Sequence, residues 1–474
     1  MIDDELKLEA GSKDEADDAE DEADGTEEAA LPIGTERYTL KHARPDPVVF
    51  PRLAADIPAC GGTIRTRLED FEVEEMALYN FSGHGEHCYV TVRKTNRTTL
   101  QARDFLAREL NVRREEIGFA GFKDKRAIAT QTFSIAGVKR EDVERISAPW
   151  LEVLQVTYHG NKLRTGHLLG NHFKITIRGV RPGALADARR VIDRLRATGM
   201  PNFYGPQRFG AFSHGYLIGH ALLHRNVKEA IDQILSPRQQ TDEKVWHYYQ
   251  AGDYATALEE LPPGRVCEAA VLHALRRYPG NFRAAVRKIP PQLRRMYYSA
   301  YQSFLFNWAI HERREWSEDA LSCPVAGDIA YLHRNGASFA VEAGEEDVMR
   351  ERAARGEISP TGPIFGRKMK FARGRPGALE WAILAAEHLR PQSFLSHVKG
   401  LHLDGTRRPL RVLLKEVDIR EADDGTSLVL AFELPPGSYA TTLLEQIMGP
   451  GRVEARGDGA DDVDERAEAS AVEE

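Results

Sequence analysis

The chain has 474 residues, of which 42% are hydrophobic and 29% are charged, as in a globular protein of two or three domains. Its net charge is −8, and it holds no apolar run approaching the ~18 residues that span a bilayer. Its four cysteines form no C-x-x-C pair, which argues against a zinc site or a disulfide framework.

The two ends are much more acidic than the rest. Residues 1–30 carry a net charge of −12 and residues 452–474 a net charge of −6, which leaves residues 31–451 with a net charge of +10. We expect the ends to be disordered acidic tails and the basic remainder to suit a polyanion such as nucleic acid. The start lacks the basic-then-apolar pattern of a secretory signal, so we expect a cytoplasmic protein.

Three stretches of the first 180 residues alternate between apolar and polar side chains. These are residues 63–76, 87–94 ("HCYVTVRK") and 172–178 ("HFKITIR"). Such alternation is typical of strands with one buried and one exposed face, and it predicts a mainly antiparallel sheet.

Two helices are predicted among these strands. Thr98 and Gln101 form a capping box at the start of the first. The second runs from about Leu185 to Leu195 and is closed by Gly199.

Helical patterns dominate from about residue 215 to 400. One row of aromatic and aliphatic residues has helical spacing: Tyr297, Tyr301, Phe304, Leu305 and Trp308. We interpret this row as a buried helix core rather than a base-stacking platform. Glycine-rich residues 344–356 and 374–377 predict loops, and strand patterns return near 401. The order indicates an α+β fold, with a sheet domain interrupted by a helical insertion and then completed.

Motifs for nucleotide phosphates and for a serine nucleophile are not found. The sequence has no G-x-x-x-x-G-K-[ST] and no G-x-S-x-G, and Gly83-x-Gly85 lacks the third glycine. His84 and His87 flank Glu86, but without H-E-x-x-H spacing they predict a polar hairpin tip rather than a metal site.

The stretch "GFAGFKDKRAIATQ" (118–131) places Asp124 among three cations on a connection between two predicted strands. A lone aspartate of this kind is usually a solvated turn residue. Here the cations would stabilise its negative charge and attract phosphates, whereas the carboxylate would repel them. The combination favours an acid that acts on a nucleotide.

Two further stretches combine rigid turns with aromatic residues. "PNFYGPQRFG" (201–210) offers Asn202, Phe203 and Tyr204, side chains that suit an unstacked base but equally suit a packed bend. "LPPGSYATTLLEQ" (434–446) delivers Tyr439 to the start of a helix, as a pocket wall or as ordinary helix entry.

In their order along the chain, these motifs resemble the TruD family of tRNA pseudouridine synthases. "LEDFEVEE", "SGHGEHCYVTVRK", "NKLRTGHLLGNHFKITIR" and "SPTGPIFG" add to the resemblance, which runs from about Gly61 to Met448. It implies that the chain isomerises a flipped-out uridine of tRNA, typically at position 13 in the D-arm region, without cofactor or metal. The chain would act as a monomer.

The resemblance also implies a pseudouridine-synthase domain with a mixed or antiparallel sheet and an inserted, mainly helical TRUD domain. The expected division is an acidic tail (1–30), the first part of the catalytic domain (31–227), the insertion (228–413), the completing part (414–451) and a second acidic tail (452–474).

Asp124 takes the place of the family's catalytic aspartate, as nucleophile or in assisting glycal formation. Phe71, Asn202 and Tyr439 match positions that contact the target nucleotide, Tyr439 by stacking on uracil. Arg65 or Lys123 is expected to pair with Asp124.

Gln207 and Arg208 are expected to bind the RNA backbone or to shape the site. The chain departs from the family where Phe203 precedes Tyr204 and where residue 439 is tyrosine rather than phenylalanine. Two rival hypotheses are a non-catalytic RNA-binding role, suggested by the basic body, and a phosphate-handling enzyme, suggested only by the glycine-rich turn.

Overall fold

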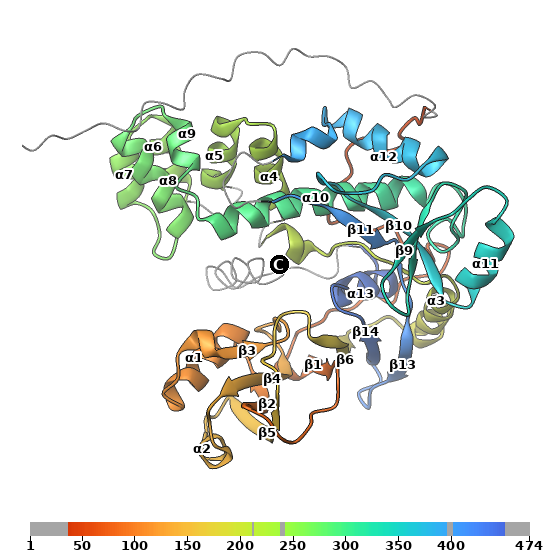
Figure 1. Cartoon of the computed structure of the whole chain (residues 1–474), viewed down its shortest axis with the longest axis horizontal. Coiled ribbons are helices and arrows are strands. Elements are labelled where there is room, and N and C mark those ends of the chain that lie inside the picture. The colour runs from red at the N-terminus through yellow and green to blue at the C-terminus, as the bar shows by residue number, and fades with distance from the viewer. Residues whose placement is uncertain (1–36, 211–212, 238–241, 396–401, 451–474) are drawn as a thin grey trace, which may run out of the picture.

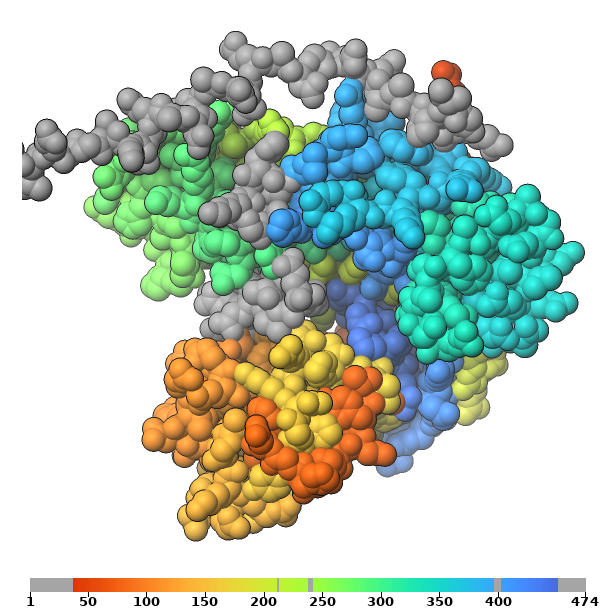
Figure 2. Space-filling view, in the orientation of Figure 1, coloured from red at the N-terminus to blue at the C-terminus, as the bar shows by residue number. Residues whose placement is uncertain are grey.

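The computed structural model describes residues 37–210, 213–237, 242–395 and 402–450. Strands β1 to β6 gather in one lobe, most helices lie in another together with β9 to β11, and α13 of the C-terminal segment lies between the two (Figure 1). Blue residues of the C-terminal part lie between the orange-to-yellow strands and the green-to-cyan lobe (Figure 2). No helix within the described ranges is long and apolar enough to cross a membrane.

The larger sheet is mixed and has eight strands. They are β1 (Phe71–Ala77), β2 (His87–Thr95), β3 (Ile117–Phe119), β4 (Ile128–Ala136), β5 (Leu151–His159), β6 (Leu168–Arg178), β13 (Lys415–Glu421) and β14 (Ser427–Leu434). Their order is β13-β14-β6-β1-β4-β2-β5, with β3 paired to β4. Only β1 and β4 run parallel among these pairs. The predicted α+β class, with C-terminal strands completing the sheet, is confirmed.

Two cores lie against this sheet. The first packs under α3 (Ala184–Thr198) and α13 (Ala440–Met448), and it draws its buried residues from two segments, 54–200 and 412–448. The second packs under α1 (Thr99–Glu109) and α2 (Arg140–Glu144). The predicted capping box at the start of α1 and the glycine end of α3 are both present, because both are written in local sequence.

The strand predicted for residues 63–76 is shorter in the structure. It begins at Phe71, after the 3-10 turn η1 (Leu68–Asp70). Arg65, which the alternating pattern placed in the strand, has a φ of 58° and lies in an irregular segment. This backbone turn aims the Arg65 side chain at the ring of Phe71.

The second lobe is built on a long central helix, α10 (Pro291–Arg313). The other helices are α4 (Gly215–Leu223), α5 (Val227–Leu235), α6 (Glu243–Gln250), α7 (Tyr254–Glu259), α8 (Val266–Arg277), α9 (Phe282–Val286) and α12 (Gly374–Ala386). Tyr301, Phe304 and Trp308 of α10 are at most 2% exposed. The predicted aromatic row is therefore a helix core, with Tyr297 half-buried at its edge.

A second sheet, which the sequence patterns did not predict, packs beside α10. Its strands are β8 (Ile329–Leu332), β9 (Ser338–Ala340), β10 (Ile358–Ile364) and β11 (Thr406–Pro409), with α11 (Glu346–Ala354) against them. The loops predicted at 344–356 and 374–377 are wrong, since α11 and the start of α12 occupy them. A third, two-stranded sheet pairs β7 (Met200–Pro201) with β12 (Arg411–Val412).

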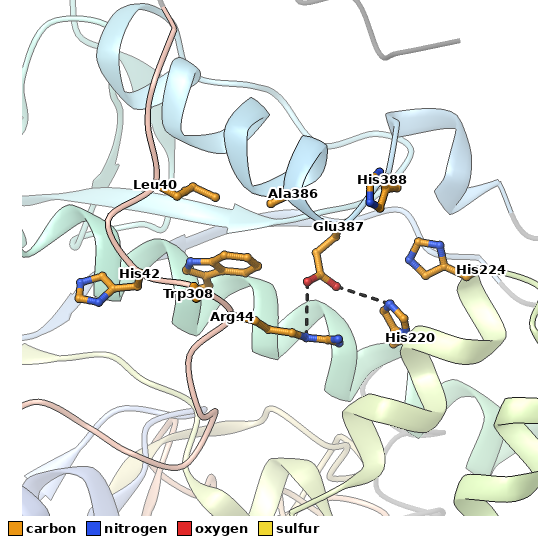
Figure 3. A pocket seen from close by; sticks show the side chains of 10 residues that line it. Leu40, His42, Arg44, His220, His224, Trp308, Ala386, Glu387 and His388 are labelled. Carbon is orange, nitrogen blue, oxygen red and sulfur yellow. Dashed lines mark ion pairs between the residues drawn. The ribbon is translucent and has the colours of Figure 1, made fainter. Parts of the chain in front are cut away.

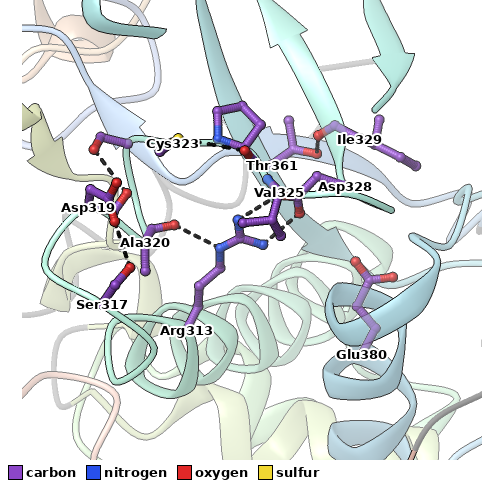
Figure 4. Close-up of polar contacts among 12 residues, drawn as sticks. Arg313, Ser317, Asp319, Ala320, Cys323, Val325, Asp328, Ile329, Thr361 and Glu380 are labelled. Atoms are coloured by element: carbon purple, nitrogen blue, oxygen red, sulfur yellow. Dashed lines mark hydrogen bonds and ion pairs between the residues drawn. The ribbon is translucent and has the colours of Figure 1, made fainter. Parts of the chain in front are cut away.

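A buried ion pair joins α10 to the second sheet. Both terminal nitrogens of Arg313 donate to the Asp328 carboxylate, at 2.6 and 2.5 Å, and its Nε donates to the Ala320 carbonyl (Figure 4). Asp328 also accepts from the backbone N–H of Val325 at 2.8 Å. Because the side chains are at most 3% exposed, removing either partner would leave the other as an uncompensated buried charge.

Candidate active site

The loop that carries Asp124 connects the antiparallel strands β3 and β4, as the sequence predicted. Thr99, the first residue of α1, holds this loop in place: its hydroxyl accepts from the Lys123 N–H at 2.9 Å and donates to Gln131 Oε1 at 3.1 Å. The Gln131 amide in turn donates to the Gly121 carbonyl. Helix, loop and strand are thus linked through two polar side chains, Thr99 and Gln131, and two backbone groups of the loop.

A buried lysine that the sequence reasoning missed supports the same loop from beneath. Lys94 is 0% exposed, and its Nζ donates to the carbonyl of Arg97 at 2.6 Å and to those of Lys123 and Asp124 at 3.4 Å. Lys94 continues the apolar face of β2 after Val92, and a lysine at that position was the available signal. A charge buried this deeply needs strong acceptors, so it holds the loop carbonyls in place.

Asp124 pairs with Arg65. Their side chains approach to 3.2 Å between Arg65 Nη2 and Asp124 Oδ2, and they are 18% and 35% exposed. The guanidinium also lies 4.3 Å above the centroid of the Phe71 ring. Phe71 itself is 1% exposed and packs against Phe173, so in this structure it contacts Arg65 from below rather than the open site.

Lys123 pairs instead with Glu75, a residue that the sequence reasoning did not single out. Lys123 Nζ lies 2.8 Å from Glu75 Oε2, and the two side chains are 3% and 5% exposed. The partner of Asp124 is therefore Arg65, from outside the motif. Of the motif's own cations, Lys123 is buried, Lys125 is half-buried and Arg126 is exposed.

The loop crosses the boundary between the two cores. Along β4, Ala129 belongs to the core under α3 and α13, Phe133 belongs to the core under α1 and α2, and Gln131 lies between them. Glu75 marks the same boundary on β1, beyond Val73. Asp124 is consequently left one-third exposed where no core covers the sheet.

A second cluster is built around Asn202, which is 5% exposed. Its Nδ2 donates to the Pro409 carbonyl at 2.8 Å, and its Oδ1 accepts from Arg408 Nη2 at 2.6 Å. The same Arg408 nitrogen donates to the Gly437 carbonyl at 2.7 Å, and the guanidinium lies 4.2 Å over the Tyr204 ring. Arg408, which the sequence reasoning missed, thereby connects residues far apart in the chain.

Tyr439 belongs to this second cluster. It is the N-cap residue of α13, and its ring centroid lies 6.0 Å from that of Tyr204 in an edge-on arrangement. A side chain at Gly205 would approach the Tyr439 ring to 3.0 Å, so the glycine allows this close contact. Tyr204 and Tyr439 are both half-buried.

The departure at Phe203 and Tyr204 has a clear structural result. Phe203 is 1% exposed and stacks on Phe50 at 5.0 Å, away from the cluster. The following residue, Tyr204, is the one that meets Tyr439. The order of the two rings therefore places a tyrosine hydroxyl, rather than a bare phenyl ring, beside residue 439.

Gln207 and Arg208 lie on the short 3-10 helix η3 (Pro206–Phe209). Arg208 Nε donates to Ser303 Oγ at 3.0 Å, and its Nη2 donates to Ser299 Oγ, both on α10. These contacts dock the loop onto α10 and favour the site-shaping alternative for Arg208. Gln207 is half-buried beside it.

The strand register brings the two clusters to the same end of the sheet. Leu434, the last residue of β14, lies opposite Asn171 of β6, and Asn171 lies opposite Glu75 of β1. Tyr439 follows five residues after Leu434, on the connection that leaves this end of β14. The chain thus offers a carboxylate on a fixed loop and a pair of aromatic rings reached from the same edge of the sheet, which are groups suited to chemistry on a stacked, planar ligand.

Comparisons with known proteins identify the family to which the chain is similar. A family model described as tRNA pseudouridine synthase D (TruD) matches residues 50–447. A tRNA pseudouridine synthase D of Geobacter metallireducens is 40% identical over 404 residues, which cover 84% of this chain and 98% of the relative. One from Thermus thermophilus is 38% identical over 408 residues, covering 85% and 93%.

A solved structure is similar over the same extent. It is that of a Methanosarcina mazei protein provisionally described as tRNA pseudouridine synthase D, with a TM-score of 0.70 and 28% sequence identity. The match covers 84% of this chain and 96% of that one. The residues matched by the family model include Asp124, Asn202 and Tyr439.

Proposed function

The chain belongs to the TruD family of tRNA pseudouridine synthases, and we propose that Asp124 is its catalytic residue and the uridine at position 13 of tRNA its target. The enzyme isomerises uridine to pseudouridine: the N1–C1′ bond breaks, uracil rotates, and a C5–C1′ bond forms while the C5 proton leaves and N1 gains one. The reactants and products have the same atoms and oxidation state, so we propose that neither metal nor cofactor takes part.

The observation that carries the assignment is the setting of Asp124. Its carboxylate is one-third exposed, on a loop fixed by Thr99 and Lys94, with Arg65 at 3.2 Å. A carboxylate held in this way can act at C1′, as a nucleophile or in assisting glycal formation. The guanidinium fixes its orientation, which lowers the cost of reaching a reactive geometry.

The target base must leave its stack to reach this carboxylate, at a cost of a few kcal/mol. We assign stacking on the flipped uracil to Tyr439, with Tyr204 beside it, because ring stacking repays part of that cost. Asn202 acts by holding Arg408, whose second contact is the Gly437 carbonyl just before Tyr439. Phe71 acts by supporting Arg65.

The tRNA backbone requires a positive surface, and the second lobe supplies one. Residues 269–311 contain seven arginines and lysines and no acidic residue. Arg283, Arg287 and Lys288 are exposed around α9, at the outer end of the helical lobe (Figure 1). We assign this surface to phosphates of the tRNA, with the D-arm reaching Asp124.

The division into domains is likewise proposed at residues 227/228 and 413/414. The core under α3 and α13 supports it, since its residues come from segments 54–200 and 412–448. A further core lies mostly within the insertion, at residues 230–293, and also takes in Ile218, Ala221 and Leu222 of α4, before the proposed boundary. We propose that the chain acts as a monomer, which sedimentation would test, and in the cytoplasm, where tRNA is modified.

Pseudouridine mapping of total RNA, from cells with and without the gene, tests the proposed target. We expect the signal at tRNA position 13 to disappear without the gene and to return with the wild-type gene. Unchanged signal at position 13 would refute the proposed target. Growth or tRNA folding rescued equally by Asp124→Ala would instead favour the non-catalytic RNA-binding role.

A further inference from the structure

A cavity of about 610 Å³ lies in the second lobe, between α4, α10, the end of α12 and the N-terminal segment that crosses them (Figure 3). Its walls include four histidines, and among them His220 and His224 face the carboxylate of Glu387. None of these residues belongs to the loop or the clusters around Asp124. The cavity is therefore a separate feature of the lobe.

Three of the side chains form a compact set of metal-ligand donors. His220 lies on α4 and His224 is its C-cap residue, so the four-residue spacing puts both rings on one side of the helix. Glu387 is the C-cap residue of α12, and its Oε2 lies 3.7 Å from His220 Nε2. One ligand atom from each residue lies within 4.8 Å of the other two.

The histidines are suited to donate lone pairs. Their ring centroids lie 4.3 Å apart, and both side chains are half-buried. The Nε2 atom of His224 is buried without a hydrogen-bond partner in the described part of the chain. A buried nitrogen of this kind ordinarily has a partner, and its lack of one points to a missing ligand.

The carboxylate is already oriented by groups behind it. The Tyr301 hydroxyl donates to Glu387 Oε2 at 2.5 Å, and Arg44 Nε lies 3.4 Å from Oε1. Arg44 is itself held over the rings of Tyr216 and Phe304, at 5.8 and 5.2 Å. Such outer partners are typical of carboxylates that bind metals, because they fix the direction of the ligand oxygen.

We propose that His220, His224 and Glu387 bind a divalent transition-metal ion of the zinc class, which clamps α4 to the end of α12. Two imidazole nitrogens and one carboxylate oxygen form a donor set typical of Zn²⁺, with water in the fourth position on the cavity side. Ligand atoms of a tetrahedral zinc site are about 3.3 Å apart. Since the three ligand atoms lie within 4.8 Å of one another, binding an ion requires them to approach by up to about 1.5 Å.

The clamp has a structural role. It joins the beginning of the helical lobe to a helix more than 150 residues later in the chain, around the central α10. An ion bound to the folded state alone stabilises that state in proportion to the logarithm of its concentration. The proposal leaves the reaction at Asp124 free of metal.

Zinc titration of chelator-treated full-length protein tests the proposal, with calorimetry for stoichiometry and thermal unfolding for stability. We expect one Zn²⁺ per chain and a rise in Tm, and Co²⁺ should give the visible absorption of a tetrahedral site. His220→Ala and His224→Ala should each weaken binding at least tenfold. His247→Ala, which removes an exposed histidine of α6, should bind as wild type does.

Glu387→Gln tests the site if a histidine variant does not fold. Glutamine has nearly the same shape as glutamate and keeps an oxygen that accepts the hydrogen bond from Tyr301. It should fold, as circular dichroism would show, and lose the Zn²⁺-dependent rise in Tm. A wild-type protein that binds no Zn²⁺, or three ligand variants that bind it as tightly as wild type, would overturn the proposal.

Discussion

The Arg65 guanidinium lies between the Asp124 carboxylate, at 3.2 Å, and the Phe71 ring, at 4.3 Å. The buried ring of Phe71 on β1 therefore supports the proposed catalytic acid indirectly, through its contact with Arg65. Asp124 and Phe71 are 53 positions apart in sequence, and the backbone turn at Arg65, with its φ of 58°, brings the three together. The arrangement makes Arg65 a positioning residue.

Replacing Arg65 with glutamine is expected to slow pseudouridine formation by about 10- to 100-fold, because the carboxylate loses its oriented partner. Binding of tRNA should change much less, by roughly threefold, since one surface charge is lost. Single-turnover kinetics and filter binding separate the two effects. Arg67→Gln, in an exposed residue of the same segment, is the matched control. If Arg65→Gln forms pseudouridine as fast as wild type, Arg65 does not position Asp124.

The buried pair of Lys123 and Glu75 predicts strong coupling in stability. Glu75→Gln leaves the Lys123 ammonium uncompensated and should lower the free energy of unfolding by about 3–5 kcal/mol. Adding Lys123→Met should recover much of that loss, because no buried charge then remains. Urea unfolding of the wild type, both single variants and the double variant measures the coupling. Simple additivity of the two single effects would contradict the pairing.

Glu445 of α13 predicts a pH dependence of stability. Burial raises the pKa of Glu445 to about 8, from an ordinary value of 4.5. The folded state then binds a proton that the unfolded state has lost, so this residue lowers stability as pH rises from about 4.5 to 8. Glu445→Gln should be more stable than wild type at pH 8, by on the order of 3 kcal/mol, and nearly equal to it at pH 4.5.

Thermal unfolding of both proteins across this pH range gives the difference directly. A difference in Tm that stays constant between pH 4.5 and 8 would show that Glu445 is ionised throughout.

The basic surface around α9 predicts a salt-dependent contribution to tRNA binding. Changing Arg283, Arg287 and Lys288 to glutamine should weaken binding and reduce the slope of log Kd against log salt by up to about 3. Binding measured at several salt concentrations gives the slope. Removing two other exposed arginines, Arg350 of α11 and its C-cap residue Arg355, should leave the slope nearly unchanged. An unaltered slope in the triple variant would place the tRNA elsewhere.

Local signals allowed much of the fold to be predicted. The capping box of Thr98 and Gln101 and the alternation in β2 and β6 each act within a few residues, and each is present in the structure. Strand β10 was missed because Pro360 and Pro363 argue against a strand, yet it pairs on both sides. The segment forms a strand because it pairs with β8 and β11, which are distant in sequence.

The site residues likewise fall into those that local sequence could predict and those that depend on long-range contacts. The order of the motifs predicted that Asp124 is a site residue. Which residues pair with Asp124 and with Lys123 could not be decided from the sequence, because the pairing depends on strand register and on the backbone turn at Arg65. Arg408 and Glu75 gave no local signal, whereas Lys94 did, as a lysine on an apolar strand face. The histidines at positions 220 and 224 also carried a readable four-residue spacing, and their partner Glu387 could be found only in three dimensions.

The central claim is that Asp124 performs the isomerisation, and one substitution tests it most directly. Asp124→Asn keeps the size of the side chain and removes its negative charge. It should form no detectable pseudouridine on an unmodified tRNA transcript while binding that tRNA within about threefold of wild type. Glu72→Gln, which neutralises an exposed acid on β1, should keep full activity. Pseudouridine formed by Asp124→Asn at the wild-type rate would contradict the claim.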